Sequence, residues 1–324
     1  MGRRYSSAAA FSMAGALAAC DGPQSALRTG GVDAAQLAQL FWVMLAGAVV
    51  LWLLVNGLFL YVTRIKTRSL SRKWAEALII GGGIVFPTIV LGALLAYGLT
   101  MMPDQRAPGD GLRVRITGEQ WWWRVEYWPE GAETPVISAN ELRLPAGLRS
   151  EIELTSAEVI HSFWVPGLGG KTDMFPGRPT RMSLEPTEPG SYRGQCAEFC
   201  GASHALMAMQ AVVMEPAAFD AWLAKEAAPA SLPEGPGRDL FFREGCGACH
   251  SLRGTEAAGA VGPDLTHLGG RSSLAAGILP MTSEALARWI FDPASIKPEA
   301  HMPAYSHLSD AELASLAGWL EQLQ

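Results

Sequence analysis

Two long apolar stretches stand out in the first third of the chain. Residues 40–62 (LFWVMLAGAVVLWLLVNGLFLYV) and residues 77–102 (ALIIGGGIVFPTIVLGALLAYGLTMM) contain no charged side chain. Each is longer than the ~20 residues that an α-helix needs to cross a bilayer. Two uncharged stretches of this length, joined by one short loop, are poor candidates for core helices of a soluble protein. The pattern therefore predicts a hairpin of two transmembrane helices within residues 39–102.

The loop between the two stretches is basic. Its positive residues all precede Glu76, the first acid, and are Arg64, Lys66, Arg68, Arg72 and Lys73. Basic loops stay on the cytoplasmic side of a membrane. We therefore expect residues 21–38 and everything after Met102 to lie on the outer side.

The first twenty residues have the features of a signal peptide. Arg3 and Arg4 precede an alanine-rich stretch, residues 8–19, that is too short to span a membrane. The run LAAC, ending at Cys20, resembles the lipobox of bacterial lipoproteins, which implies Cys20 as a lipidated mature N-terminus. An ordinary cleavage site that precedes a cysteine is the alternative. Together with the helical hairpin and its basic loop, this signal predicts a multi-pass protein of the bacterial plasma (inner) membrane, with its later domains on the periplasmic side.

Short β-rich segments follow from residue 112 to about residue 213. They are LRVRITGEQWWWRVEYW, EIELTSA, RMSLEP and MQAVVMEP, and clusters of Gly and Pro separate them. This pattern predicts an all-β sandwich or barrel, which we assign to residues 103–223. A helical tail, AAFDAWLAKEAA, leads into the Pro/Gly-rich run PASLPEGPG, and we assign the linker to residues 224–236.

Residues 237–324 change to helical patterns. GRDLFFREG and SEALARWIF predict short helices, and SDAELASLAGWLEQLQ predicts a longer one that begins with a capping box of Ser309 and Glu312. Its apolar stripe consists of Leu313, Leu316, Leu320 and Leu323. The chain therefore ends in a small all-α domain.

Acidic residues outnumber basic residues along the chain. There are 31 Asp and Glu against 25 Lys and Arg, which gives a net charge of -6 at pH 7. This balance excludes nucleic acid as a partner. A solvated surface is the ordinary explanation of such charge, although an acidic face also steers basic protein partners.

A cysteine pair in the C-terminal domain belongs to the motif CGACH, from Cys246 to His250. C-x-x-C-H is the attachment motif of covalent c-type haem, in which two thioethers hold the porphyrin and the histidine binds iron. A thioredoxin-like redox pair is the alternative, but the βαβ setting of that motif is missing. Candidates for the sixth iron ligand are His267, Met281, His301, Met302 and His307.

Met302 is the sixth ligand we favour, and His301 is its main rival. The segment HMPAY around Met302 resembles the distal-ligand segment of small soluble cytochromes c, and GPDLTHLGG resembles the segment that packs around their proximal histidine. That resemblance implies a carbonyl of Pro263 that orients His250. A Met/His pair raises the haem potential, which suits an electron carrier.

The second cysteine pair lies in CAEFCGASHALM, from Cys196 to Met207, within the β-rich region. A blue-copper site needs one cysteine, two histidines and an axial methionine, so this motif holds one thiolate too many. Two cysteines on one loop allow two bridged copper ions, with His204 and Met207 as terminal ligands and His161 as the only other histidine of this region. A disulfide leaves His204 and Met207 unexplained, and a zinc site seldom uses methionine.

Taken together, these motifs resemble subunit II of a haem–copper cytochrome c oxidase with a cytochrome c domain fused to its C-terminus. The resemblance is carried by CAEFCGASHALM, by HSFWVPGLGGKTDMFPGR from His161 and by GEQWWWRVEY from Gly118. It implies a transmembrane hairpin, a cupredoxin-like sandwich and a class I cytochrome c domain. It further implies subunit I, and subunit III, as partners in the membrane and cytochrome c or another electron donor outside it.

The resemblance also implies particular residue roles. Two copper ions would be held by the side chains of His161, Cys196, Cys200, His204 and Met207 and by the backbone carbonyl of Glu198. The Glu198 side chain would reach a magnesium ion at the contact with subunit I. Trp121 would be the point where electrons enter from cytochrome c, although packing within a strand explains a tryptophan equally well.

Three positions depart from that family pattern. Trp122 and Val125 stand where tyrosines are expected, which concerns the docking surface and not the copper ligands. Glu76 precedes the second apolar stretch by one residue, about a turn early for the carboxylate that the family often places at a proton-channel mouth.

The function expected from the sequence is electron relay within an oxidase. A reduced donor would deliver one electron to the covalent haem. The electron would pass to the copper pair and then to subunit I, where oxygen is reduced to water. The alternative is a membrane-anchored haem and copper protein that serves a different reductase. Nitrous oxide reductase shares the copper motif but needs a large further domain, quinol oxidase subunit II lacks the copper ligands, and copper delivery needs no haem.

Overall fold

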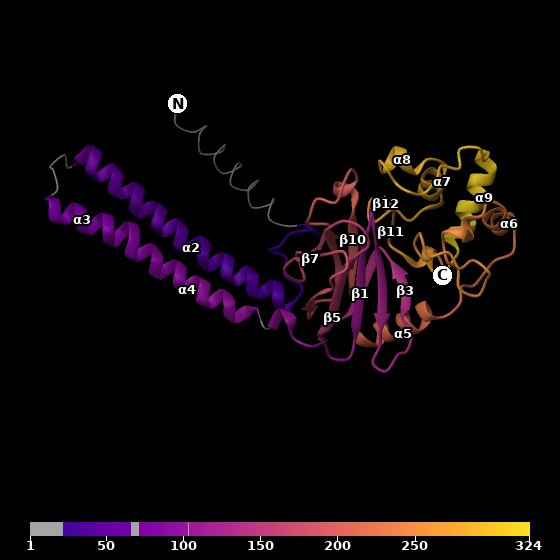
Figure 1. Ribbon diagram of the computed structural model, residues 1–324, viewed down its shortest axis with the longest axis horizontal. Helices are drawn as coiled ribbons and strands as arrows, with labels where there is room; N and C mark the ends of the chain where they lie inside the picture. The colour runs from indigo at the N-terminus through magenta and orange to yellow at the C-terminus, as the bar shows by residue number, and fades with distance from the viewer. Residues whose placement is uncertain (1–21, 66–70, 103) are drawn as a thin grey trace, which may run out of the picture. The chain divides into compact units, whose positions relative to one another are not determined.

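The computed structural model describes residues 22–65, 71–102 and 104–324 (Figure 1). They fall into two compact units, one of residues 35–106 and one of residues 22–34 together with 107–324. The predicted signal peptide with Cys20, and Lys66 and Arg68 of the basic loop, lie outside the described residues.

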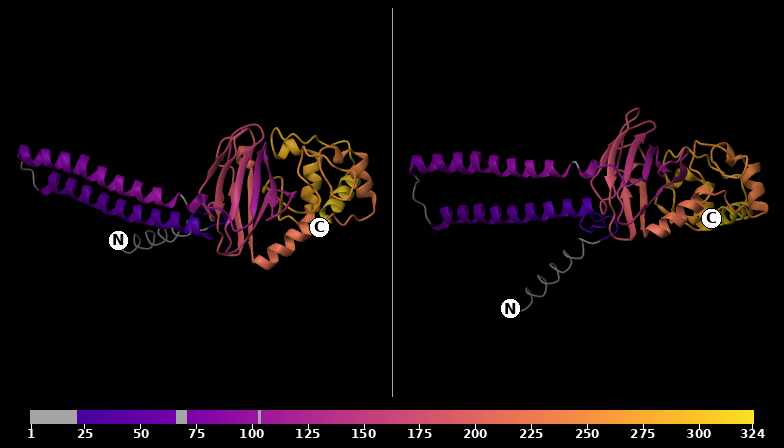
Figure 2. Two further views of the ribbon diagram at one scale, coloured as in Figure 1. Left: turned by 60° about the horizontal axis from the view of Figure 1, so that its bottom comes forward. Right: turned by 90° about the horizontal axis from the view of Figure 1, so that it is seen from below.

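The smaller unit consists of most of two long helical segments that run in opposite directions (Figures 1 and 2). Val32–Ile65 has a mean hydropathy of 2.4 and Arg72–Met101 of 2.3, and neither apolar window is buried within the structure. Length, composition and exposure therefore fit the predicted pair of membrane-spanning helices. The parts of the segments are α2 (Val32–Leu60), η1 (Tyr61–Ile65), α3 (Arg72–Ile80), η2 (Gly81–Val85) and α4 (Phe86–Met101), and the short η3 (Asp104–Arg106) follows.

The larger unit contains a β-sandwich. One sheet has five strands in the order β3-β2-β1-β5-β8, the other has three in the order β4-β10-β9, and β6 and β7 form a separate pair. Both sheets pair strands that are distant in sequence: β1 pairs in parallel with β5, and β10 pairs in parallel with β4. The strands are β1 (Arg113–Glu119), β2 (Trp122–Trp128), β3 (Val136–Ala139), β4 (Glu141–Pro145), β5 (Ser150–Ser156), β6 (His161–Phe163), β7 (Thr172–Met174), β8 (Thr180–Leu184), β9 (Gly190–Gln195) and β10 (Ala208–Met214).

The core of the sandwich follows from strict alternation in β1 and β2, where every second side chain is buried. Val114 and Ile116 of β1 lie opposite Tyr127 and Val125 of β2, and all four are fully buried. A repeat of two places one face of a strand against the core. Val125, which replaces an expected tyrosine, is therefore a core residue of this sheet.

Helix α5 (Pro216–Ala227) is the predicted helical tail, and it packs against the sandwich. Its Phe219 and Trp222 rings pack against Tyr127, with ring centroids 6.3 and 5.1 Å from the tyrosine ring. The helix extends into the interval 224–236 assigned to the linker, and the non-helical connection covers residues 228–235.

The C-terminal domain is built from helices around one apolar core. The capping box of Ser309 and Glu312 opens α9, and the predicted leucine stripe is buried, as is Trp319, whose ring lies 5.5 Å from Phe241. A two-strand ladder of two residues each, β11 and β12, is an addition to the predicted helices. The elements are α6 (Pro236–Arg243), η5 (Cys246–Ala248), η6 (Leu268–Gly270), β11 (Ser273–Leu274), β12 (Leu279–Pro280), α7 (Ser283–Phe291), α8 (Pro293–Ile296) and α9 (Asp310–Glu321).

Candidate functional site

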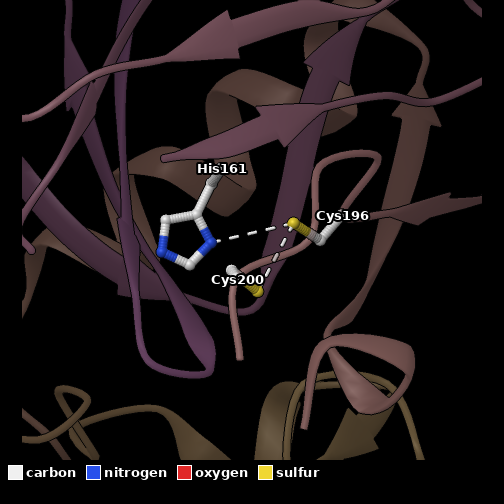
Figure 3. A group of neighbouring side chains, drawn as sticks. All are labelled: His161, Cys196 and Cys200. Carbon is white, nitrogen blue, oxygen red and sulfur yellow. Dashed lines mark hydrogen bonds between the residues drawn. The ribbon is translucent and has the colours of Figure 1, made fainter. Parts of the chain in front are cut away.

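The loop from Cys196 to Met207 is held at both ends by the sandwich. Strand β9 ends one residue before Cys196 and β10 begins one residue after Met207, and the Cys196 amide donates a hydrogen bond to the Met207 carbonyl (2.9 Å). The chain must therefore fold back within this loop. Both cysteines are buried, and their Sγ atoms lie 3.8 Å apart without a disulfide (Figure 3).

Each sulfur has an imidazole nitrogen beside it. His161 begins β6, is fully buried, and places Nδ1 3.7 Å from Cys196 Sγ (Figure 3). His204 begins η4 (His204–Leu206) and places Nδ1 3.6 Å from Cys200 Sγ. The two cysteines and two histidines thus form two pairs, each of one sulfur and one nitrogen. The two pairs lie side by side because their sulfurs are close together.

The other two predicted ligands complete this cluster. Met207 Sδ lies 3.9 Å from Cys200 Sγ, and the Glu198 carbonyl lies 3.2 Å from Cys196 Sγ. Met207 is fully buried, whereas the side chain of Glu198 is exposed and leaves only its backbone in the cluster. The structure therefore brings together all six residues predicted for the copper centre.

The sulfur cluster favours a thiolate at Cys196. The proximity of the Cys200 thiol lowers the pKa of Cys196 far below that of an ordinary cysteine, and hydrogen bonding from His161 acts in the same direction. The pKa of Cys200 is raised, first by its hydrogen bond with the Cys196 sulfur and then by burial and by the charge on Cys196. Soft sulfur donors with imidazoles suit copper and not magnesium or calcium.

A glycine makes room for the buried histidine. A Cβ atom on Gly118 of β1 would lie 2.7 Å from Cδ2 and 2.8 Å from Cγ of His161. The His161 ring also packs against Trp123, the partner of Gly118 on the neighbouring strand β2, with 6.1 Å between ring centroids. The position of the imidazole is therefore fixed by packing as well as by its chain.

Trp121 lies beside this cluster at the turn between β1 and β2. Its Nε1 donates a hydrogen bond to the Cys200 carbonyl (3.0 Å), and Gln120 Nε2 donates to the same oxygen (2.7 Å). The side chain is only 4% exposed, belongs to the apolar core of the sandwich, and lies against His301 of the C-terminal domain. Trp121 therefore both packs within the sandwich and contacts the sulfur cluster.

A cavity of about 420 Å³ lies where the C-terminal domain meets Trp121 and Trp122. Its walls include the two cysteines and the histidine of the predicted haem attachment motif, the favoured sixth ligand and its main rival. These residues are Cys246, Cys249, His250, His301 and Met302. Cavities of this size take large organic ligands.

His250 is held in one orientation and one tautomer. Its Nδ1 donates a hydrogen bond to the Pro263 carbonyl (2.7 Å), which leaves Nε2 as the free lone pair. Burial lowers the pKa of His250 below its ordinary value, although the bond to Pro263 acts in the opposite direction. Gly262 allows the close approach, since a Cβ atom there would lie 2.5 Å from His250 Cε1.

Met302 and His301 have different surroundings. Met302 is half-buried and packs against the apolar core of the C-terminal domain. The His301 ring lies against Trp121 of the sandwich, with 6.1 Å between ring centroids. Met281 packs against the same core but does not line the cavity, and His267 Nε2 donates a hydrogen bond to the Ala228 carbonyl (3.0 Å).

Two buried cations at the cavity were not predicted. Arg271 lines it, donates to the Asp264 carbonyl (2.5 Å), and has an Nε without a partner among the described residues. Lys297 lines it too and reaches backbone oxygens of both domains. The partners of Lys297 lie far away in sequence, so no local pattern identifies it.

Residues 112–215 match the protein family described as "Cytochrome C oxidase subunit II, periplasmic domain", and residues 235–324 match "Cytochrome c". Cytochrome c oxidase subunit 2 of Bacillus subtilis is 31% identical over 256 residues, covering 74% of this chain and 70% of that protein. The chain belongs to the cytochrome c oxidase subunit II family. It carries the family's periplasmic domain followed by a fused cytochrome c domain, so this predicted resemblance is confirmed.

Two further relatives of this subunit II chain are informative. Subunit 2 from Alkalihalophilus pseudofirmus is 37% identical over 226 residues, covering 68% of this chain and 64% of that protein, a little under two thirds of its length. The crystal structure of the periplasmic domain of subunit II from Bradyrhizobium japonicum is 28% identical, with a TM-score of 0.32, and covers 37% of this chain and 95% of that one.

Two other predicted positions of the subunit II chain have clear surroundings. Trp122 is half-buried beneath the Arg124 guanidinium, which lies 4.8 Å from its ring centroid. Glu76 forms an ion pair with Arg72 one turn earlier in α3 (2.7 Å). A role of Glu76 at a proton channel stays a prediction.

Proposed function

We propose that this chain relays electrons within a cytochrome c oxidase. A reduced donor would give an electron to a haem attached at Cys246 and Cys249. The electron would then pass through a centre of two copper ions to subunit I, where oxygen is reduced to water. The observation that carries the proposal is the arrangement of both donor sets in one compact unit, with Trp121 bonded to the Cys200 carbonyl and lining the cavity that holds the haem attachment residues.

The sulfur cluster fits two copper ions. Cys196 and Cys200, whose sulfurs lie 3.8 Å apart, would both hold the copper pair, and each sulfur already has its own imidazole nitrogen within 3.7 Å. His161 and Cys196, with the Glu198 carbonyl, would bind one ion from one side, and His204, Cys200 and Met207 would bind from the other. The His161 Nε2 atom is buried without a partner among the described residues, so the ring depends on Nδ1 for its interactions.

The cavity fits a covalently attached haem. Cys246 and Cys249 lie at its wall to form the thioethers, and the Pro263 carbonyl leaves His250 Nε2 for the iron. We assign the sixth position to Met302, because it lines the cavity and packs against the domain core while His301 turns to Trp121. The unpartnered Nε of buried Arg271 is suited to an anionic group of the haem.

Trp121 joins the two centres through the residues of this chain. Its ring borders the cavity, and its Nε1–H bonds to the carbonyl of Cys200. When bound, the haem iron and the copper pair each supply a one-electron change. The task of the protein is to hold both centres in fixed positions and to exclude water between them.

The apolar hairpin places this relay at a membrane. We propose the bacterial plasma membrane, with both domains on the periplasmic side, subunit I as the electron acceptor, and subunit III as a further partner. The exposed carboxylate of Glu198 is our candidate for a magnesium ion at the contact with subunit I.

The test is oxygen uptake by the complex, purified in mild detergent through a tag on this chain and fed with reduced cytochrome c. Met207→Leu removes one copper ligand with little change in volume, and Met209→Leu makes the same change at a buried core position of β10. We expect cyanide-sensitive uptake that falls at least tenfold in Met207→Leu and stays near wild type in Met209→Leu. A chain that purifies alone, with haem and copper but no oxygen uptake, would instead favour the electron carrier of a different reductase.

A further inference from the structure

One short segment of the cytochrome c domain contacts the sandwich beside the proposed copper ligands. We call residues 297–302, KPEAHM, the bridging segment. Lys297 Nζ donates to the Trp121 carbonyl (2.5 Å), and the Pro298 carbonyl accepts from Ser203 Oγ (2.6 Å). His301 lies against the Trp121 ring, and Met302 follows directly. The segment that carries the proposed iron ligand thus also rests on Trp121 and on the neighbour of His204.

Lys297 is an unusual choice for such a contact. It is 3% exposed, and none of the ion pairs among residues 22–65, 71–102 and 104–324 includes it. Burial of an ammonium group is costly unless its hydrogen bonds are made. Here the acceptors are two backbone carbonyls, Trp121 of the sandwich and Ala275 of the cytochrome c domain (3.0 Å).

An apolar residue would fill this space at lower cost, but it would specify no single arrangement of the two domains. A lysine is satisfied only when carbonyls of both domains lie at the right distance. Separation of the domains would remove the Trp121 acceptor and break the geometry on which the buried group depends. The contact therefore selects one docked position among the many that an eight-residue connection, residues 228–235, permits.

We propose that Lys297 is a positioning residue, which fastens the bridging segment to the Trp121 carbonyl and so holds the Met302 side of the haem cavity against the copper centre. This inference rests on the proposed function. It has a further consequence for Trp121, whose side chain is only 4% exposed and lies against His301 of the chain's own cytochrome c domain. A soluble donor must then deliver its electron to the cytochrome c domain and not to Trp121.

Lysine labelling of the full wild-type chain tests the docked state without any mutation. Lys297 is buried, whereas Lys225 on α5 is exposed and serves as the internal reference. With an amine-reactive ester at pH 8, followed by peptide mass spectrometry, we expect Lys297 to react at least tenfold more slowly than Lys225. Equal rates would show that the domains separate freely and would overturn the proposal.

Amide hydrogen exchange in variants tests the role of Lys297 itself. Two amides donate across the domain boundary, Ala208 to the Ala276 carbonyl (3.0 Å) and Ser272 to Glu141 Oε2 (2.9 Å), so their exchange reports docking directly. Loss of one hydrogen bond to a charged group changes the equilibrium constant between the docked and separated domains by about tenfold or more. We expect exchange at both amides to rise by about tenfold in Lys297→Met and to return toward wild type in Lys297→Arg.

Arg288→Met is the matched control, because it removes one positive charge from an exposed position on α7 of the same domain. Its exchange should equal that of wild type. Unchanged protection of Ala208 and Ser272 in Lys297→Met would refute the positioning role. Both readouts are independent of metal loading, so a chain without copper or haem would contradict the proposed function while the docking result stands on its own.

Discussion

Replacement of Gly118 by alanine should disable the copper centre while the fold is retained. The added Cβ would lie 2.7 Å from His161 Cδ2, 2.8 Å from Cγ and 3.1 Å from Cβ, and ordinary contact begins near 3.4 Å. These atoms are the rigid imidazole ring of His161 and its Cβ atom, so the clash cannot be relieved by moving the flexible end of a side chain. His161 must therefore move by about 0.7 Å, or β1 must move instead, to remove the clash.

Such a shift is large for a metal ligand and modest for stability. Ligand distances in metal sites hold within about 0.2 Å, so a displacement of His161 by several times that amount should weaken copper binding severely. Overpacking of a full core costs about 1–3 kcal/mol of unfolding free energy. We therefore expect Gly118→Ala to fold with reduced thermal stability and to hold less than half of the wild-type copper.

The assay combines copper stoichiometry and visible absorption of the purified chain with thermal unfolding. Gly318→Ala is the matched control, since it adds the same methyl group inside α9, where a Cβ atom meets nothing within 4 Å. There alanine should stabilise the helix by about 0.5–1 kcal/mol. If Gly118→Ala retains full copper and an unchanged spectrum, packing against β1 does not position His161 and the reasoning fails.

Two further predictions concern the cytochrome c domain. Met302→Ala should abolish sulfur ligation of the haem iron and lower the haem potential, whereas His301→Ala should leave both unchanged; redox titration and the visible spectrum decide, and the reverse result would assign the sixth position to His301. The Arg243 guanidinium and the Ser309 amide lower the pKa of Glu312 to about 2, below its ordinary value near 4.5, so its stabilising contribution is complete above pH 4.5 and is lost as the pH falls through about 2. The difference in melting temperature between wild type and Glu312→Gln should therefore shrink as the pH falls from 5 to 2, and a constant difference would contradict this linkage.

Local patterns predicted the parts of this protein whose structure is local. The apolar stretches gave the helical hairpin, and the spacing of Ser309, Glu312 and the four leucines gave α9 with its cap and buried stripe. The sandwich was predicted as a class from segments that became β1, β2, β5, β8 and β10. Strands β3, β4, β6, β7 and β9 were missed, because most are short and their burial does not alternate cleanly along the sequence.

The candidate sites divide in the same way. Cys196, Cys200, His204 and Met207 lie on one loop, so their spacing alone indicated a metal site. His161 lies 35 residues before Cys196, so no spacing connected it with the loop; it was singled out as the only other histidine of the β-rich region and by the family resemblance. Gly118 and Gly262 carry no chemical signal, since their contribution is the absence of a side chain where His161 and His250 need room.

Lys297 shows why the contact between the two domains could not be predicted. Its acceptor at Trp121 lies 176 residues earlier, and a carbonyl oxygen leaves no mark in the sequence because every residue has one. The Pro/Gly-rich connection suggested a mobile tether, yet it is followed by a bridging segment with three contacts to the sandwich. A tether limits only the distance between two domains, whereas these contacts specify their orientation, and electron relay between fixed centres depends on orientation and distance together. The fusion of the cytochrome c domain therefore contributes more than proximity, since the bridging segment combines contacts to the sandwich with the proposed iron ligand Met302.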